Sequence, residues 1–546
     1  MTSVSSFARS LLLLLACATV LASCDSALEE DPTSFVGPDN FYNNAEDALA
    51  ALDGAYKGLN NDFDGETYIP DETHLQLVET PGPTLMPIPN YTSGSPEYAM
   101  DNWTWSPSLP NLVPAYEDAY EGINLANAVI DNVPGIENMD TGLRERIVAE
   151  ARFIRSIHYF NLVRLFGAVP LRRSEVKDLA NAQSTLPRTP EDSLYTFLIN
   201  DLERTISVLP PKSEYSGGDV VRASKGAAQM QLAKVYLRRG SMSAANGLTG
   251  QRQLAQDGDY RKALDLINEV IDSGEYTLSE DVQEQYRDMF IDATANQPPG
   301  EGAIFAIQRD AATDGSSNFL PCLTAPAGSD KFADASWSNF TSELPFYNSF
   351  ENADLRKEVS FITEYGEGES RAVYDQDDIE GDGYTIDTPT PYKHAVQDGS
   401  STYCGENNDF VLLRYADLLL MKAEAINEMN RGPNGEAYDA INRIRNRAGL
   451  DDLDSDLGYE GFREALFTER SRELFFEHKG WFDVQRYFDI ATERIEAHAQ
   501  VDGNESYLLG PADPQIDDPQ DRLFPIPQIA LDRNSELVQN DEYYGY

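Results

Sequence analysis

Apolar residues recur at helical spacing through most of this chain, and the repeat limits the folds that it can adopt. In the segment 143–167, LRERIVAEARFIRSIHYFNLVRLFG, the apolar or aromatic positions are Ile147, Ala151, Ile154, His158, Leu162 and Leu165. Steps of three and four residues place these side chains on one face of an α-helix. Gly167 and Pro170 then end the predicted helix.

The same spacing predicts further helices around 44–59, 113–133, 191–208, 222–239, 259–273, 411–429, 436–448 and 459–479. Several of them form pairs with short connections, as in antiparallel helix hairpins. The segment 260–278, YRKALDLINEVIDSGEYTL, has the Ala and Leu spacing and the closing Gly-x-Tyr of a tetratricopeptide-like hairpin. Repeated helix pairs predict a mainly all-α fold, a tetratricopeptide-like superhelix with a concave side.

Two blocks lack this periodicity. Residues 61–110 are rich in Pro, Gly, Asn and aromatics, and a second irregular block runs over about 276–408. Long irregular segments inside a compact protein are usually functional or disordered. The aromatic side chains argue against disorder here, so we expect the blocks to carry a function.

The N-terminus has the features of an export signal. Apolar residues from Leu11 to Ala22 follow Arg9, a run of about 12 residues that is too short to span a membrane. The sequence Leu-Ala-Ser-Cys ending at Cys24 resembles a bacterial lipobox, which predicts a lipoprotein signal peptide over 1–23 and lipidation of Cys24. An ordinary cleaved signal with an incidental cysteine is the alternative. The carboxylates over 25–31 resemble an acidic tether for surface export, although the whole chain is acidic.

Composition restricts the partners. The 546 residues include 42 basic and 92 acidic ones, which gives a formal charge of −50. Nucleic acid is therefore an unfavourable partner, because binding phosphates needs a basic surface. Lysine is scarce, with 11 residues against 31 arginines, and an acidic, lysine-poor chain is typical of halophilic proteins.

Of the other cysteines, Cys17 leaves with the signal, while Cys322 and Cys404 either pair or remain two buried thiols.

Several stretches together resemble one known family. Residues 149–171, AEARFIRSIHYFNLVRLFGAVPL, look like a signature of the SusD/RagB family of outer-membrane nutrient-binding lipoproteins. Further matches follow in the family's order, from a first helix to a C-terminal end: 41–59, 223–237, 408–428 with 440–450, 465–487 and 523–540. They cover the mature chain from about residue 30 onward.

The resemblance implies a single SusD-like domain over 24–546. It implies a scaffold of tetratricopeptide-like helix pairs, about 40–275 and 409–490, with the irregular insertion of about 276–408 building the ligand face. It also implies a surface-exposed lipoprotein of the outer membrane that binds glycans, or peptides in some branches, and passes them to a SusC-like TonB-dependent transporter. Such proteins bind without catalysis. The loops expected to contact ligand match no pattern, so the ligand's identity does not follow from the resemblance.

The chain offers no catalytic or cofactor motif. The five histidines, at 74, 158, 394, 478 and 498, have no metal-ligand spacing, and neither a nucleophile elbow nor a phosphate-binding loop occurs. We expect His158 and His478 to be packed in the core. Asp378, Glu380, Asp382 and Gly383 fit the start of an EF-hand loop, but Pro389 stands where that loop needs a bidentate Glu. A solvated acidic turn is the simpler interpretation, and we predict no catalytic residue, metal site or cofactor.

The positions of the tryptophans predict a carbohydrate site. Trp481 falls in a predicted helix and is expected in the core, whereas the other three indoles lie in irregular blocks. An exposed aromatic ring complements the C–H face of a sugar, while amides and carboxylates bind its hydroxyls. The predicted carbohydrate-binding residues are therefore Asp101, Asn102, Trp103, Trp105, Trp337 and Tyr347. We expect Trp103 and Trp337 to share one surface with exposed ring faces, although either indole of 103 and 105 could instead anchor its loop.

The main alternative is a tetratricopeptide-like scaffold that binds peptide or protein segments in its concave groove. Such a groove needs aromatics and Asn or Arg on the inner faces of the helices. Here the tryptophans lie mostly in loops, which favours glycan capture over peptide binding.

The lipobox generates a direct prediction. If Cys24 is the acylated residue, Cys24→Ala should leave the protein unprocessed or released in soluble form, because the acyl chains supply the anchoring energy. Cell fractionation and N-terminal mass analysis measure this outcome. A substituted protein that is still membrane-bound and cleaved before residue 24 would contradict the lipobox.

Overall fold

The computed structural model describes residues 41–60, 72–87, 95–177, 185–242, 256, 258–290, 300–309, 320–326, 339–365, 372–373, 389–394, 408–501 and 522–540. These parts are mainly helical and contain four two-stranded sheets. The predicted mainly all-α fold class is confirmed. The tetratricopeptide-like detail of the helix pairs stays a prediction. The proposed signal peptide and Cys24 lie outside the described residues.

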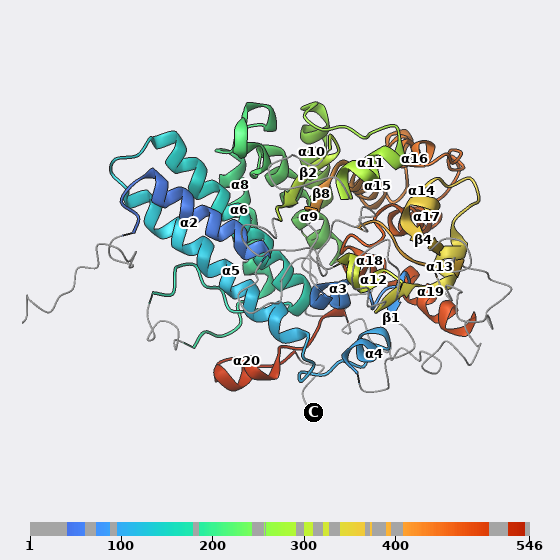
Figure 1. The fold of residues 1–546 in the computed structure, drawn as a ribbon, viewed down its shortest axis with the longest axis horizontal. Helices are drawn as coiled ribbons and strands as arrows, with labels where there is room; N and C mark the ends of the chain where they lie inside the picture. The colour runs from blue at the N-terminus through green and yellow to red at the C-terminus, as the bar shows by residue number, and fades with distance from the viewer. Residues whose placement is uncertain are drawn as a thin grey trace, which may run out of the picture.

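Long helices form the scaffold and pack in chain order (Figure 1). The N-terminal half has α2 (Ala45–Lys57), α5 (Leu112–Asn132), α6 (Thr141–Phe166), α8 (Glu191–Ile206), α9 (Lys225–Ser241) and α10 (Asp259–Asp272). The C-terminal half has α15 (Tyr415–Asn430), α16 (Gly435–Arg447), α17 (Tyr459–Glu473), α18 (Gly480–Arg486) and α19 (Phe488–Val501). Because α10 packs on α15, the two halves share one core.

The helix predicted from the strongest periodicity is the most buried one. In α6 the Asp140 side chain accepts a hydrogen bond from Leu143 N at 2.9 Å and caps the first turn. Every residue from Phe153 to Phe166 is buried, because α5 and α8 pack on opposite sides of α6. Gly122 of α5 allows the close approach, since a Cβ there would meet His158 Nε2 at 2.2 Å. Gly167 ends α6 with a φ of +72°.

Two of the expected helix boundaries are wrong. The helix expected over 411–429 begins only at Tyr415, because Phe410–Arg414 forms strand β8 and pairs antiparallel with β2 (Ala303–Ile307). The helix expected over 459–479 ends at Glu473. Phe476 and His478 then have φ values of +61° and +57°, so the backbone leaves the helical conformation. Both residues are buried, which compensates for these unfavourable conformations.

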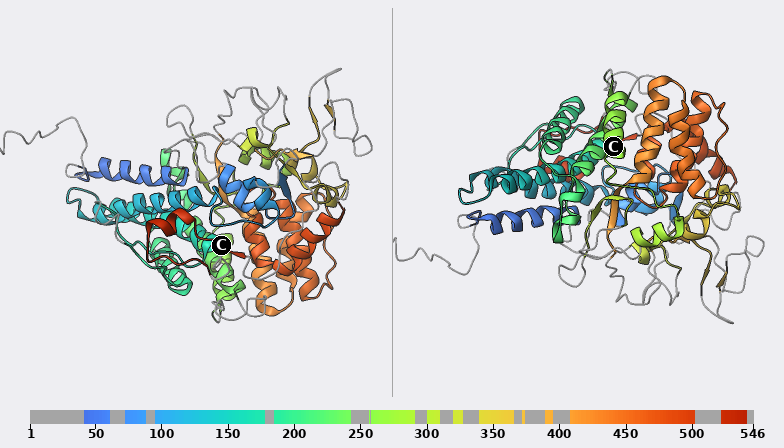
Figure 2. Two further views of the ribbon diagram at one scale, coloured as in Figure 1. Left: turned by 90° about the horizontal axis from the view of Figure 1, so that it is seen from below. Right: turned by 90° about the horizontal axis from the view of Figure 1, so that it is seen from above.

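Short elements occupy the described parts of the irregular blocks: α3 (Glu72–Val78), β1 (Leu85–Pro87), α4 (Pro96–Asp101), α11 (Val282–Phe290), α12 (Leu320–Thr324), β3 (Phe340–Ser342), α13 (Leu344–Ser349), α14 (Arg356–Ser360), β4 (Phe361–Ile362), β5 (Glu364–Tyr365), β6 (Ala372–Val373) and β7 (Thr390–Pro391). Near the C-terminus α20 (Gln528–Arg533) packs beside the N-terminal half. Figure 2 shows α3, α4 and α12 on the side of the molecule opposite to α15–α17. None of the described helices is long and apolar enough to cross a membrane.

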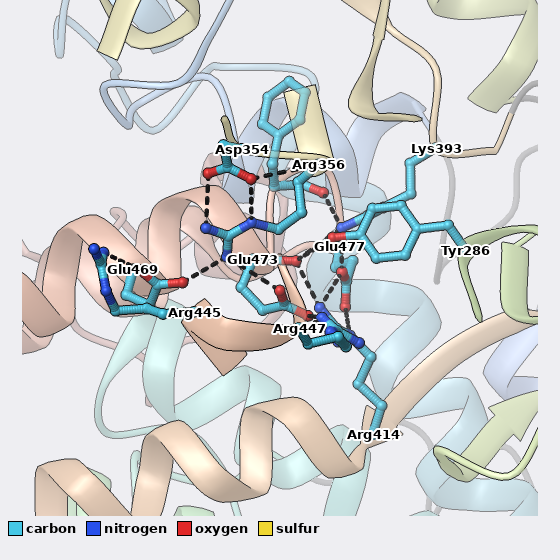
Figure 3. Close-up of polar contacts among 11 residues, drawn as sticks. Tyr286, Asp354, Arg356, Lys393, Arg414, Arg445, Arg447, Glu469, Glu473 and Glu477 are labelled. Atoms are coloured by element: carbon cyan, nitrogen blue, oxygen red, sulfur yellow. Dashed lines mark hydrogen bonds and ion pairs between the residues drawn. The ribbon is translucent and has the colours of Figure 1, made fainter. Parts of the chain in front are cut away.

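A buried cluster of charges lies where these short elements meet the scaffold (Figure 3). Glu473, the last residue of α17, forms ion pairs with Arg414 at 2.7 Å, Arg447 at 2.6 Å and Arg356 at 3.2 Å. The three arginines come from β8, α16 and α14. Glu477 neutralises Arg414 at 2.6 Å and Lys393 at 2.5 Å. One pair of carboxylates therefore binds cations from four separate segments.

The charges of this cluster are mutually compensated. Burial opposes ionisation of Glu473, but Arg447, Arg414 and Arg356 together hold the pKa of its carboxyl well below its usual value. Arg356 also donates to Asp354 at 2.9 and 2.8 Å and to Glu469 at 2.6 Å. Buried ions are tolerated only when they are paired and hydrogen-bonded in this way.

Removing the charge of Glu473 tests how much the fold depends on the cluster. We expect Glu473→Gln to lower the free energy of unfolding by about 3–5 kcal/mol at neutral pH, because buried arginines lose their counter-ion. Chemical denaturation measures the change. The contribution should be present above the unfolded carboxyl pKa, about 4.3, and be lost as pH falls toward the depressed folded value.

The matched control is Glu460→Gln on the same helix. The Glu460 side chain is 70% exposed and pairs with Arg463 at 3.0 Å, so its loss should cost less than about 1 kcal/mol. Equal stability losses in the two variants would contradict the special contribution of the buried cluster.

Candidate functional site

The described parts of the irregular blocks join one another into one layer. Strand β1 pairs antiparallel with β3, with Leu85 opposite Ser342. Ser342 N and Thr341 Oγ1 both donate to the carbonyl of Pro389 at 3.0 Å, and β4 pairs with β7 just beyond. Three segments far apart in the sequence, 81–87, 339–365 and 389–394, therefore form one layer on the scaffold. We call it the short-strand layer.

One turn, residues 474–479, attaches this layer to the scaffold. Lys393 Nζ donates to the carbonyls of Glu473 at 2.9 Å and Phe475 at 3.1 Å. From the other block, Glu79 Oε1 accepts from Lys479 N at 2.9 Å. Burial raises the pKa of Glu79 to about 8, against the opposing effect of hydrogen bonds from the backbone N–H groups of Lys479 and Gly480. Both irregular blocks are thus bound to the same six residues.

Trp103 and Trp105 point into the core beneath the short-strand layer. Their ring centroids are 5.6 Å apart, and both meet Trp481 edge-on, at 5.0 and 5.6 Å. Trp103 Nε1 donates to the carbonyl of Pro81 at 3.1 Å. Trp105 also packs against Phe524 near the C-terminus at 4.8 Å. The prediction that Trp481 belongs to the core is confirmed, since its side chain is fully buried.

The expected exposure of Trp103 is wrong. Trp103 is 5% exposed and Trp105 is 6% exposed, so neither presents a ring face to a sugar. Trp103 has a φ of +55°, and this left-handed conformation turns the indole inward. Residues 103–105 directly follow the end of α4 at Asp101, so the position of both rings is set by the end of that helix. Trp337 lies outside the described residues, so the expectation that it shares a surface with Trp103 stays a prediction.

The other predicted binding residues differ in accessibility. Asn102 is buried and donates to the carbonyl of Tyr98 at 3.0 Å, which closes α4. Asp101 is partly exposed, and burial raises the pKa of its carboxyl to about 7. Tyr347 of α13 is half-buried, with its ring edge-on to Phe361 at 5.1 Å and Lys357 Nζ 4.2 Å from the ring centroid. Among the predicted carbohydrate-binding residues that the structure describes, Asp101 and Tyr347 keep accessible surface.

The histidines are packed in the interior. His74 and His478 approach through their Nδ1 atoms at 3.0 Å, and burial lowers the pKa of His74 and of His158 to about 3. The predicted burial of His158 and His478 is confirmed. Within the described ranges there is no group of three or more His, Cys, Asp or Glu residues that could hold a metal ion. The acidic run 378–383, the side chain of Cys322, and Cys404 lie outside what the structure describes.

Sequence patterns did not reveal the residues that hold the short-strand layer, above all Glu79, Lys393 and Glu477. A signal was present in 470–483, RSRELFFEHKGWFD, where six charged residues lie among four aromatic ones. Charges in so apolar a segment are expected to be buried in pairs. The partners that come from the irregular blocks, Lys393 for Glu477 and Glu79 for Lys479, lie 80 or more residues away, so this pairing could not be read from spacing.

Comparison with known proteins gives a consistent result. A model described as "SusD family" matches residues 336–546, and one described as "Starch-binding associating with outer membrane" matches 90–237. SusD-like protein P2 of Formosa agariphila is 27% identical, over 96% of this chain and 97% of its own length. The starch-binding protein SusD of Bacteroides thetaiotaomicron is 25% identical, over 81% and 80%. A crystal structure of a SusD homolog from B. thetaiotaomicron superposes with a TM-score of 0.76, at 22% identity, over 92% of this chain and 97% of that one.

The location of Trp103 generates a stability prediction. Trp103→Ala should lower the free energy of unfolding by about 3–5 kcal/mol, because it removes a buried indole from a packed aromatic cluster. Trp103→Phe is the control that keeps an aromatic ring but loses the bond to Pro81 and part of the buried volume, and it should cost less than Trp103→Ala. Unchanged unfolding of Trp103→Ala together with weakened glycan binding would return Trp103 to the ligand face.

Proposed function

Because the chain belongs to the SusD/RagB family, we propose that it is a surface-exposed outer-membrane lipoprotein that captures oligo- or polysaccharides. It passes them to a partner SusC-like TonB-dependent transporter and does not alter them chemically. The observation that carries the proposal is the match of residues 90–237 to a family described as starch-binding and associating with the outer membrane. The relationship to a starch-binding protein along four-fifths of the chain supports it.

The proposed capture surface is the short-strand layer. Its described segments are bound to a rigid, buried charge cluster, and pre-organised segments lose less entropy when a ligand binds. In this layer Tyr347 supplies an accessible aromatic ring, and Lys357 supplies a donor next to it. Asp101 at the end of α4 supplies an acceptor for sugar hydroxyls.

The proposed anchor is an acylated Cys24. Several acyl chains suffice for stable attachment, at about 0.8 kcal/mol per buried CH₂. The carboxylates over 25–31 then form the tether that faces outward. A charge of −50 fits a halophilic setting, where salt screens the repulsion between surface carboxylates.

Binding to a panel of soluble glycans tests the proposal. Starch-derived oligosaccharides, a β-glucan and an acidic polysaccharide should include at least one ligand. Tyr347→Ala should weaken its binding roughly tenfold or more without a matching loss of thermal stability. Isothermal titration calorimetry and a melting curve measure the two effects, and an assay for reducing ends should stay flat over prolonged incubation.

The control variant is Tyr438→Ala. Tyr438 of α16 is also half-buried and also packs edge-on against a phenylalanine, Phe462 at 5.1 Å, but it belongs to the helical scaffold. Its loss should leave glycan binding unchanged. Sustained release of reducing ends would refute a binding protein. Binding of peptides with no binding of any glycan would favour the peptide-binding alternative, and failure to co-purify with a barrel transporter would refute the transfer step.

A further inference from the structure

A pocket lies in the N-terminal helices, apart from the short-strand layer. It has a volume of about 470 Å³ and opens between α5, α6, α8 and the segment 171–177. Its lining is formed by Ile130, Arg152, Arg155, Arg173, Ser193, Thr196, Phe197, Asn200, Asp201 and Arg204. The volume is in the range of ordinary small-ligand sites, about 300–1,000 Å³.

The charge of this pocket is opposite to that of the chain. Its lining has four arginines and one carboxylate, in a protein with a formal charge of −50. The carboxylate, Asp201, forms an ion pair with Arg155, whose Nε and Nη2 donate to it at 2.9 and 2.6 Å. The other three arginines form no ion pair with any residue that the structure describes. Arg152, Arg173 and Arg204 therefore have no carboxylate at ion-pair distance among the described residues.

Other arginines of the chain are surrounded by carboxylates instead. Arg222, for example, contacts Asp53, Asp219 and Glu150 at 2.8, 2.9 and 3.5 Å. Around Arg152, burial is the main cause that lowers the guanidinium pKa, and neighbouring Arg155 and Arg204 lower it further against the opposing effect of Asp201. Holding like charges together costs stability, so the fold gains nothing from this arrangement.

The pocket also has the surfaces that a sugar ring needs. Ser193, Thr196, Phe197, Asn200 and Arg204 recur at steps of three and four residues, so one face of α8 carries them all. The half-buried ring of Phe197 is apolar, with the guanidinium carbons of Arg155 and Arg173 at 5.0 and 5.6 Å from its centroid. Hydroxyl and amide groups next to it can hydrogen-bond sugar hydroxyls.

We propose that this pocket binds an anionic sugar residue, with Arg152, Arg173 and Arg204 holding a carboxylate or sulfate group and Phe197 contacting the ring. Guanidinium groups match both anions, because two N–H donors can bind two oxygens at once. The choice of a sugar rests on the proposed function, whereas the choice of an anion rests on the pocket alone. The site would select acidic glycans and would act separately from the short-strand layer.

Monosaccharide probes test the inference on the full-length protein in 0.15 M salt. Methyl β-D-glucuronide, methyl glucoside 6-sulfate and neutral methyl β-D-glucoside are titrated and followed by calorimetry or ligand-observed NMR. At least one anionic probe should bind at least tenfold more tightly than the neutral glucoside. The preference between the two anionic probes identifies the anion as carboxylate or sulfate.

Substitutions localise the binding. Arg152→Gln and Arg204→Gln should each weaken binding of the anionic probe roughly tenfold, since each removes a charged hydrogen-bond donor. Neither should lower the melting temperature, because neither arginine forms an ion pair with a described residue. Arg261→Gln, on the exposed face of α10, changes the net charge equally and should leave binding unchanged.

Different results would refute the pocket, its location or the proposed function. Equal affinity for neutral and anionic probes, no binding of either anionic probe, or an equal loss in Arg261→Gln would each refute the site. If Tyr347→Ala lost binding of the anionic probe and the arginine variants kept it, the anion would bind at the short-strand layer and not in this pocket. Polysaccharide capture that persists without anionic binding would refute this inference alone, whereas anionic binding without any polysaccharide capture would refute the proposed function alone.

Discussion

Glu473 and Glu477 neutralise cations from four separate segments, and the arrangement of the short-strand layer follows from this. Arg356, Arg414, Arg447 and Lys393 each belong to a different part of the chain, and each loses its hydration on folding. A buried cation without its carboxylate is strongly unfavourable, so the segments can only be assembled together. The cluster acts as a positional constraint, in addition to the apolar core around it.

The turn 474–479 extends this constraint outward. Its Phe475 carbonyl and Glu477 carboxylate bind Lys393 from one irregular block, and its backbone N–H at Lys479 binds Glu79 from the other. Segments with little regular structure of their own thereby keep a fixed position on a helical scaffold. A surface built in this way can change its loops while its attachment stays the same, which suits a family whose members take different ligands.

Positive charge is used in two different ways in this acidic chain. Arginines such as Arg356 and Arg414 are enclosed by carboxylates and hold the fold together. Arg152, Arg173 and Arg204 instead line an open pocket without ion pairs in the described structure. With 92 acidic residues available, a lack of counter-ions at one place is a property of the arrangement and not of the composition. Unpaired cations that cost stability point to a ligand.

Periodicity in the sequence determined the helical scaffold, because a helix buries side chains at steps of three and four residues whatever its neighbours are. It therefore predicted α6 and most of the other long helices, and the ordered motifs predicted the family. It could not predict that 410–414 is a strand, since pairing with 303–307 is a contact across more than 100 residues. Nor could it show that Trp103 turns inward, because one left-handed φ and a distant Trp481 decide that orientation. Local patterns determine local structure, whereas burial and charge pairing between distant segments are decided only when the chain is folded.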